Sequence, residues 1–231
     1  GRLIRLNTRG RGPSDWAKEA TDYAVPIEAR DAVELLDHLG LPNAMIIGTS
    51  RGGIIAMLLA VMAKDRVLGA VLNDIGPVLD RAGLDRILTY VGQVPPARSY
   101  VEAAGHLSRT MGDDFPDISE TRWAVYAERW YEEGPNGLTL RYDPRIADGL
   151  AAQAAEAPPD LWPMFEALAD LPLAVIRGEN SDLLSAATVE EMKVRCPDLI
   201  TATARNRGHV PFLNEPESLA AIHGVIDKLC K

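Results

Sequence analysis

The stretch that decides the fold lies at residues 44–60 and reads AMIIGTSRGGIIAMLLA. It opens with four apolar residues in a row, a pattern typical of a short strand that is covered on both faces. It ends in a segment that is apolar almost all round, which predicts a buried helix over residues 53–63. The stretch therefore predicts a strand, a tight turn and a core helix in immediate succession.

The turn between these two elements carries the motif Gly48-Thr49-Ser50-Arg51-Gly52, a Gly-x-Ser-x-Gly pattern. Small residues are needed beside the serine because the strand and the helix approach each other closely there. The turn forces Ser50 into an unfavourable backbone conformation and presents its hydroxyl at a helix N-terminus, where a developing anion is favoured. Ser50 is therefore the candidate nucleophile.

Similar apolar runs recur along the chain. They predict buried strands at 67–72 and 173–176; residues 200–204 are a candidate for a fourth strand, and residues 3–6 also resemble a strand. A helical pattern covers residues 27–39. This alternation indicates an α/β fold with a mainly parallel sheet and helices on both faces.

A long insertion, residues 76–169, separates the strands at 67–72 and 173–176 and contains no strand of comparable strength. We interpret it as a helical cap, and we assign residues 1–75 and 170–231 to the core. The segments of the cap with helical periodicity are 100–111, 119–133 and 162–169.

Composition restricts the class of partner. The 231 residues include 24 Lys and Arg against 33 Asp and Glu, a net charge of −9. Such a chain repels phosphate backbones and anionic lipid surfaces, so we expect a small-molecule partner and neither nucleic acid nor membrane. The longest apolar run, 54–63, is well short of the ~20 residues that cross a bilayer. Cys196 and Cys230 lack metal-ligand spacing and form no disulfide framework, which favours reduced thiols and a cytoplasmic protein.

A serine nucleophile needs a base, and the chain has four histidines. His38, His106 and His223 lie in helical patterns. His209 differs, because it follows the last predicted strand in a loop beside a glycine, where an imidazole can project from the edge of the sheet. His209 is therefore the candidate general base.

The base in turn needs an orienting acid. Asp182 follows the strand at 173–176, and sites form where loops leave the carboxyl ends of parallel strands. Two alternatives remain: Glu179 in the same loop, and Asp74, the better of the two, in the loop after the strand at 67–72. The preferred order in the chain is Ser50, Asp182, His209.

Four motifs in this order resemble the α/β-hydrolase superfamily, in particular its bacterial esterase-like members with a helical cap between the sixth and seventh strands. The motifs lie at residues 9–15, 48–53, 177–182 and 208–211. The resemblance implies Ser50 as nucleophile, His209 as general base and then acid, and Asp182 as the orienting acid. It also implies the backbone N–H of Arg51 as one oxyanion donor, with no cofactor and no metal.

The sequence departs from the pattern of this family at two places. Asn7 stands where the family often has Asp, a change that we interpret as structural. The first three strands of the family, and the loop that supplies the second oxyanion N–H, have no counterpart after Gly1. We therefore expect about 40–50 residues to be absent, either because this sequence omits an N-terminal piece or because the chain itself is a fragment.

The leading hypothesis is a serine hydrolase that cleaves a carboxylic ester or a related acyl bond through an acyl-enzyme. A serine at the elbow disfavours halide displacement and epoxide opening, for which relatives use a carboxylate there. A C–C bond hydrolase or a cofactor-free perhydrolase would keep the same triad, and a non-catalytic ligand-binding member is the remaining alternative.

Overall fold

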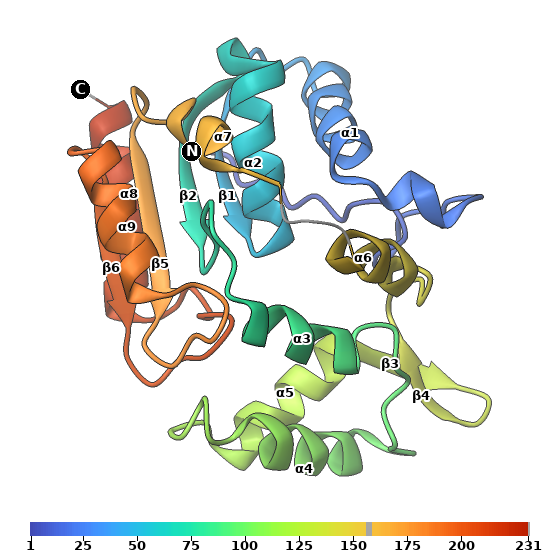
Figure 1. Cartoon of the computed structure of the whole chain (residues 1–231). Coiled ribbons are helices and arrows are strands. Elements are labelled where there is room, and N and C mark those ends of the chain that lie inside the picture. The colour runs from blue at the N-terminus through green and yellow to red at the C-terminus, as the bar shows by residue number, and fades with distance from the viewer. Residues whose placement is uncertain (156–158, 231) are drawn as a thin grey trace. The chain divides into compact units, whose positions relative to one another are not determined.

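The computed structural model describes residues 1–155 and 159–230 (Figure 1). The chain forms two compact units. The first, which we call the sheet unit, consists of Ala24–Leu84 and Pro158–Lys231. The second, the helical unit, consists of Gly1–Tyr23 and Asp85–Ala157. Within the described residues, no helix combines the length and the apolar character that crossing a bilayer requires.

The sheet unit is built on four parallel strands in the order β1-β2-β5-β6. Their bounds are Ala44–Thr49 (β1), Val67–Asn73 (β2), Leu173–Gly178 (β5) and Ile200–Ala204 (β6). Each strand lies where the sequence predicts one, and β1, β2 and β5 begin at continuous apolar runs. Because all four run in the same direction, their carboxyl ends meet at one edge of the sheet, and the loops that leave this edge lie close together.

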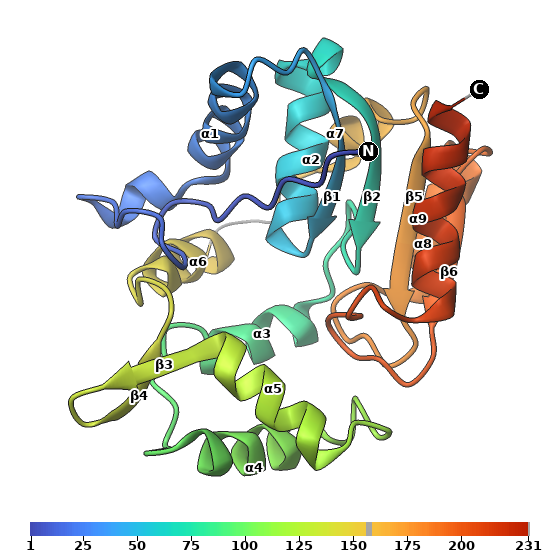
Figure 2. The ribbon, with the colours of Figure 1, turned by 180° about the vertical axis from the view of Figure 1, so that it is seen from behind.

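Helices cover both faces of this sheet, as predicted. Their bounds are Val25–His38 (α1), Arg51–Met62 (α2), Trp162–Glu166 (α7), Ala186–Arg195 (α8) and Pro216–Leu229 (α9), with a short 3-10 helix, η2, at Lys64–Arg66. Figures 1 and 2, seen from opposite sides, show α9 on one face and α2, α7 and α8 on the other. α1 packs against α2. This arrangement explains why α2 is apolar all round, since it lies between the sheet, α1 and α7.

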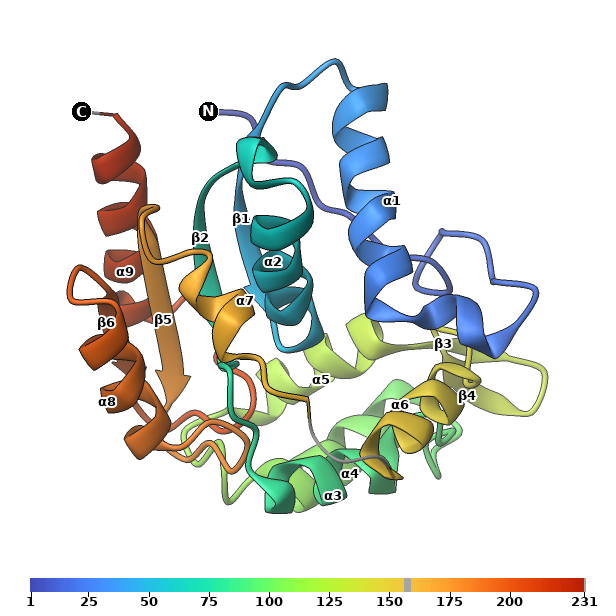
Figure 3. The same cartoon turned by 45° about the horizontal axis from the view of Figure 1, so that its top comes forward.

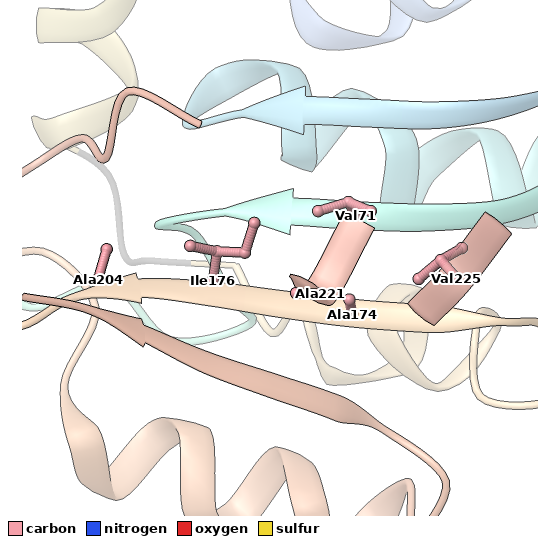
Figure 4. Close-up of a cluster of buried hydrophobic side chains, with 6 residues drawn as sticks. All are labelled: Val71, Ala174, Ile176, Ala204, Ala221 and Val225. Atoms are coloured by element: carbon pink, nitrogen blue, oxygen red, sulfur yellow. The ribbon is translucent and has the colours of Figure 1, made fainter. Parts of the chain in front are cut away.

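A hydrophobic core joins α9 to the sheet (Figure 4). It contains side chains that are at most 2% exposed, contributed by β2, β5, β6 and α9: Val71, Ala174, Ile176, Ala204, Ala221 and Val225. Val71 lies two residues before the end of β2, so its side chain is on the same face of the sheet as the last residue of that strand. Burial on both faces accounts for the continuous apolar runs of the sequence.

The helical unit has its own aromatic core. Its elements are η1 (Ala20–Tyr23), α4 (Tyr100–Met111), α5 (Glu120–Trp130), β3 (Tyr131–Gly134), β4 (Gly137–Leu140) and α6 (Ile146–Ala155), while α3 (Arg81–Tyr90) crosses from one unit to the other along the chain. α4 and α5 pack side by side, as Figure 3 also shows. Trp123, which is 2% exposed, contacts Phe115 and Tyr126 edge to face.

The N-terminal segment is tied into the helical unit by a buried carboxylate, Asp143. The Tyr23 hydroxyl donates to Asp143 Oδ2 at 2.5 Å, and Arg145 pairs with the same oxygen at 2.6 Å. Arg145 also donates to the carbonyl of Ala17 at 2.7 Å. Residues 1–23 therefore cluster with residues 85–157 rather than with the strands of the sheet.

Two expectations about the elements need correction. Residues 3–6 do not form a strand, and Leu3 is 80% exposed, so this segment lacks the burial that a central strand requires. The expected helix at 119–133 ends at Trp130, because the next residues pair as the antiparallel hairpin β3–β4. That hairpin is absent from the sequence prediction.

The compact units also divide at other residues than the predicted core and cap. Residues 76–84 cluster with the sheet unit. So does α7, whose Phe165 is completely buried, whereas residues 1–23 do not. A cap over 76–169, inserted between the sixth and seventh strands of the family, stays a prediction.

Candidate active site

Ser50 lies at the junction of β1 and α2, as predicted. Its backbone has φ 49° and ψ −119°, a region that residues with a side chain rarely adopt. Its N–H donates to the carbonyl of Asn73 at 3.0 Å, which fixes the turn to the neighbouring strand β2. The tight turn thus holds the hydroxyl at the N-terminus of α2.

The turn needs glycines at two crowded positions. A Cβ atom on Gly48 would lie 2.4 Å from the carbonyl oxygen of Gly52, and one on Gly53 would lie 2.2 Å from Cγ2 of Ile75. A Cβ on Gly52, by contrast, has no described atom within 4 Å. The close approach of strand and helix therefore depends on Gly48 and Gly53, of which only the first belongs to the Gly-x-Ser-x-Gly pattern.

His209 faces the nucleophile. It lies in the loop after β6, its side chain is 6% exposed, and its Nε2 atom is 2.9 Å from Ser50 Oγ. The structure therefore brings together the two residues that the sequence selects as nucleophile and base. His38, one of the three other histidines, is exposed on α1, as its helical pattern predicts.

Asp74, and not Asp182, supplies the carboxylate at the other ring nitrogen. His209 Nδ1 is 2.8 Å from Asp74 Oδ2, and the Asp74 side chain is completely buried. Since a carboxylate only accepts hydrogen bonds, Nδ1 carries the proton and Nε2 accepts from the Ser50 hydroxyl. The preferred assignment of Asp182 as orienting acid is thus corrected to its alternative, Asp74.

The order of the strands explains this correction. β2 is the direct neighbour of β1, and Thr49 is paired with Asn73, so the residues that follow, Ser50 and Asp74, leave the sheet side by side. β5 lies one strand further away. The loop after β5 contributes differently: the Ser181 hydroxyl donates to Asp74 Oδ2 at 2.7 Å, and the Gly178 N–H donates to Oδ1 at 2.7 Å.

The first residue of α2, Arg51, is anchored through its side chain. Its Nε atom donates to Glu28 Oε2 at 2.5 Å, and the Glu28 side chain on α1 is completely buried. The N–H groups in the first turn of a helix have no acceptor within that helix. The backbone N–H of Arg51 is thus suited to an oxyanion, but that role stays a prediction.

A carboxylate in the loop of the histidine holds this loop closed. Glu215 Oε1 accepts from Arg207 Nε at 2.9 Å and from the Phe212 N–H at 2.8 Å, while Oε2 accepts from the Ser218 hydroxyl at 2.8 Å. Burial alone would raise the pKa of Glu215, but these hydrogen bonds outweigh it and lower the pKa below its ordinary value. The loop that carries His209 therefore closes on an ionised carboxylate.

The described residues contain no group of three or more His, Cys, Asp or Glu side chains that could hold a metal ion. The thiols of Cys196, which is buried, and Cys230, which is exposed, are not joined in a disulfide. Burial raises the pKa of the Cys196 thiol, which makes it a poor nucleophile.

Comparison with known proteins shows the family. Residues 1–222 match the family described as "Alpha/beta hydrolase family". The chain belongs to the α/β hydrolase family. It is 32% identical to the 3-hydroxybutyrate-oligomer hydrolase of Cupriavidus necator, over 95% of this chain and 77% of that protein. It is 28% identical to the 2-(acetamidomethylene)succinate hydrolase of Mesorhizobium japonicum, over 97% and 78%.

A solved structure supports the fold of this α/β hydrolase. The crystal structure of an alpha/beta hydrolase from Novosphingobium aromaticivorans matches 96% of this chain and 78% of that one, with a TM-score of 0.89 and 42% identity. The parallel sheet flanked by helices, predicted from the apolar runs, is therefore the α/β-hydrolase fold.

Sequence reasoning missed two residues that hold the Ser50–His209–Asp74 arrangement of this α/β hydrolase in place. Ser181, which contacts Asp74, lies inside the motif at 177–182, but the motif assigns it no role, and Glu28, which holds Arg51, lies outside all four motifs. One signal was available for Glu28 in the sequence, an acidic residue in the first turn of a helical pattern, but its burial beside Arg51 is visible only in the structure.

Proposed function

We propose that this α/β hydrolase cleaves a carboxylic ester through an acyl-enzyme, with Ser50 as nucleophile, His209 as general base and Asp74 as the orienting acid. One observation carries the proposal: the hydrogen bonds from Ser50 Oγ to His209 Nε2, at 2.9 Å, and from His209 Nδ1 to Asp74 Oδ2, at 2.8 Å. This is the arrangement that activates a serine hydroxyl, which is otherwise a poor nucleophile at neutral pH.

The reaction proceeds in two halves. His209 Nε2 takes the proton of Ser50 as Oγ attacks the ester carbonyl carbon, and the carbonyl oxygen becomes an oxyanion beside the N-terminus of α2 and the N–H of Arg51. His209 then protonates the leaving alcohol, which departs and leaves Ser50 acylated. In the second half, His209 deprotonates a water that attacks the acyl carbon, and its proton returns to Ser50 as the acid is released.

Asp74 acts on this sequence through His209. Its carboxylate accepts the Nδ1–H bond, holds the imidazole in the tautomer whose Nε2 can take a proton, and stabilises the imidazolium that forms. Ser181 and the Gly178 N–H in turn hold the carboxylate. Asp74 itself remains ionised throughout.

The relatives favour an ester of a short hydroxy acid as substrate. The relative from Cupriavidus necator is named as a hydrolase of 3-hydroxybutyrate oligomers, and the match extends over 77% of its length. An oligomer of this kind joins its units by esters, which fits the acyl-enzyme chemistry. A cytoplasmic location, expected from composition, stays a prediction.

The test compares the wild type with Ser50→Ala on p-nitrophenyl butyrate and on the linear dimer of 3-hydroxybutyrate. We expect Ser50→Ala to lower kcat by about 10⁶-fold, because the nucleophile is lost. Cys230→Ser, which changes an exposed side chain at the end of α9, serves as control and should retain the wild-type rate. Equal rates for the wild type and Ser50→Ala would refute the assignment of Ser50.

A fluorophosphonate probe separates the remaining alternatives. Stoichiometric labelling of Ser50 requires an activated serine, so an unlabelled protein would favour a non-catalytic ligand-binding member. Labelling of Ser50 without ester turnover would favour C–C bond hydrolysis or perhydrolysis with the same three residues.

A further inference from the structure

The last residue of β2, Asn73, connects the two segments that carry the nucleophile and the base. Its side chain is buried, and the residue is 1% exposed. The amide Nδ2 donates to Thr49 Oγ1 at 3.1 Å and to the carbonyl oxygen of Pro211 at 3.0 Å. Because a carbonyl can only accept, the contact with Pro211 fixes which end of the amide points towards the loop.

These contacts reach the immediate neighbours of the triad. Thr49 directly precedes Ser50, Pro211 follows His209 by two residues, and Asn73 itself precedes Asp74. The backbone carbonyl of Asn73 also accepts the N–H of Ser50 at 3.0 Å. Ser50, Asp74 and His209 come from three separate loops, and this single residue contacts or adjoins all three of them.

The position is costly for the stability of the fold. Among the described residues, Oδ1 of Asn73 is buried without a hydrogen-bond partner, and a buried carbonyl without a partner is destabilising. Val71 lies on the same strand and the same face as Asn73, and its apolar side chain packs into the core. Proteins bury a polar atom without a hydrogen-bond partner mostly where the residue serves function.

We propose that Asn73 is a positioning residue, whose amide sets the distance between Ser50 Oγ and His209 Nε2 by holding the elbow and the histidine loop together. The proposal rests on the proposed function, because it assumes that these two atoms exchange a proton. It assigns no contact with substrate to Asn73.

The expected effect follows from how strongly proton transfer between Ser50 Oγ and His209 Nε2 depends on the distance between these two atoms. A shift of reacting groups by about 1 Å from a change outside the chemistry lowers the rate by about 10²-fold. We therefore expect Asn73→Ala to lower kcat on p-nitrophenyl butyrate, and the rate constant of fluorophosphonate labelling at Ser50, by about 10²-fold. KM should change much less, because Asn73 does not bind the ester.

The matched control is Val71→Ala, which removes buried volume from the same strand and face but touches neither loop. Circular dichroism and thermal unfolding report the folded fraction of each variant. We expect Val71→Ala to lower Tm while its labelling rate per folded molecule stays within about twofold of the wild type. A merely structural role for Asn73 would make the two variants behave alike, and that result would overturn the proposal.

Should Asn73→Ala fail to fold, a second pair of variants tests the same contact from its other end. Thr49→Val removes the acceptor of the amide and keeps the shape of the side chain, and Thr49→Ser restores a hydroxyl. Loss of one hydrogen bond corresponds to a factor of roughly five. We expect Thr49→Val to slow labelling by about that factor and Thr49→Ser to recover most of it. Equal rates for both variants would contradict the proposal.

The wild type distinguishes this proposal from the one on which it rests. A wild type that the probe does not label would overturn the proposed function and the positioning role with it. A labelled wild type, together with an equally fast Asn73→Ala, would overturn only the positioning role.

Discussion

At the scale of single residues, the most demanding position is that of Asp74. Its carboxylate accepts hydrogen bonds from His209, Ser181 and the Gly178 N–H, and its backbone has φ 54°. Residues with a side chain rarely adopt this left-handed region, and aspartate does so only occasionally. The position thus combines backbone strain with a fully buried charge, a combination typical of residues retained for chemistry.

The two candidate acids can be separated by isosteric substitution. We expect Asp74→Asn to lower kcat by about 10⁴-fold, because an amide no longer enforces the productive tautomer of His209. Asp182→Asn should cost far less, since the bond to Nδ1 comes from Asp74. Steady-state kinetics of both variants on p-nitrophenyl butyrate provide the comparison, and a larger loss in Asp182→Asn would return the role to that residue.

Sequence alone selects Ser50 and His209 as candidates because each stands out locally, one in a motif between a strand and a helix, the other in a loop beside a glycine. The acid has no such local mark. An aspartate follows both β2 and β5, and the choice between Asp74 and Asp182 depends on which strand lies beside β1. That neighbour relation is a property of the folded sheet and cannot be read from spacing along the chain.

At the scale of elements, the loop from Arg207 to Glu215 behaves as a closed unit that carries His209. The ion pair between its ends, at 2.9 Å, is largely buried, with side-chain exposures of 13% and 4%. Arg207 also lies over the ring of Phe212, 5.2 Å from its centroid. Because its own contacts already order this loop, it loses little conformational freedom during the reaction.

This closure makes the free energy of unfolding depend on pH. The pKa of Glu215 is lower in the folded protein than its ordinary value of 4.5, so its contribution is complete above that value and is lost as the pH falls towards the folded pKa. Each unit of lowering is worth about 1.4 kcal/mol. We expect the wild type to lose more stability between pH 6 and 3 than Glu215→Gln, which cannot titrate. Urea unfolding at several pH values measures both, and parallel curves would contradict the assignment.

The elements themselves differ in how well the sequence predicts them. β1, β2, β5 and β6 are predicted to within two residues. β2 and β5 are buried along almost their whole length, which imposes a continuous apolar run on each. β3 and β4 are four residues each, and β3 has no fully buried position. β4 alternates, with Leu138 and Leu140 buried, but a pattern of four residues is too short to predict a strand by itself.

At the scale of the whole molecule, the helical unit depends on polar groups buried beneath its N-terminal segment. Asp143 is completely buried, and its pKa is lowered: burial acts against ionisation, but the hydrogen bonds from Arg145 and Tyr23 outweigh it. The pKa of Tyr23 is raised, mainly by burial and then by its bond to Asp143. The ionised carboxylate of Asp143 thus joins Tyr23 to Arg145, two residues that lie far apart in the sequence.

Removing one of these donors tests that connection. Tyr23→Phe deletes the hydroxyl that bonds to Asp143, and hydrogen bonds to charged groups contribute about 1.5–3 kcal/mol. We expect the free energy of unfolding to fall by about that amount, measured in urea by circular dichroism. Labelling of Ser50 in the folded protein should keep the wild-type rate, because Tyr23 lies outside the sheet unit; a slowed rate would show that the segment also serves the reaction.

Ser50, Asp74 and His209 all belong to the sheet unit, on loops that leave β1, β2 and β6. Their mutual hydrogen bonds involve no residue of the helical unit. Substitutions or insertions in residues 85–155 therefore remove no partner of these hydrogen bonds, whereas changes in the loops after β1, β2 and β6 alter them directly.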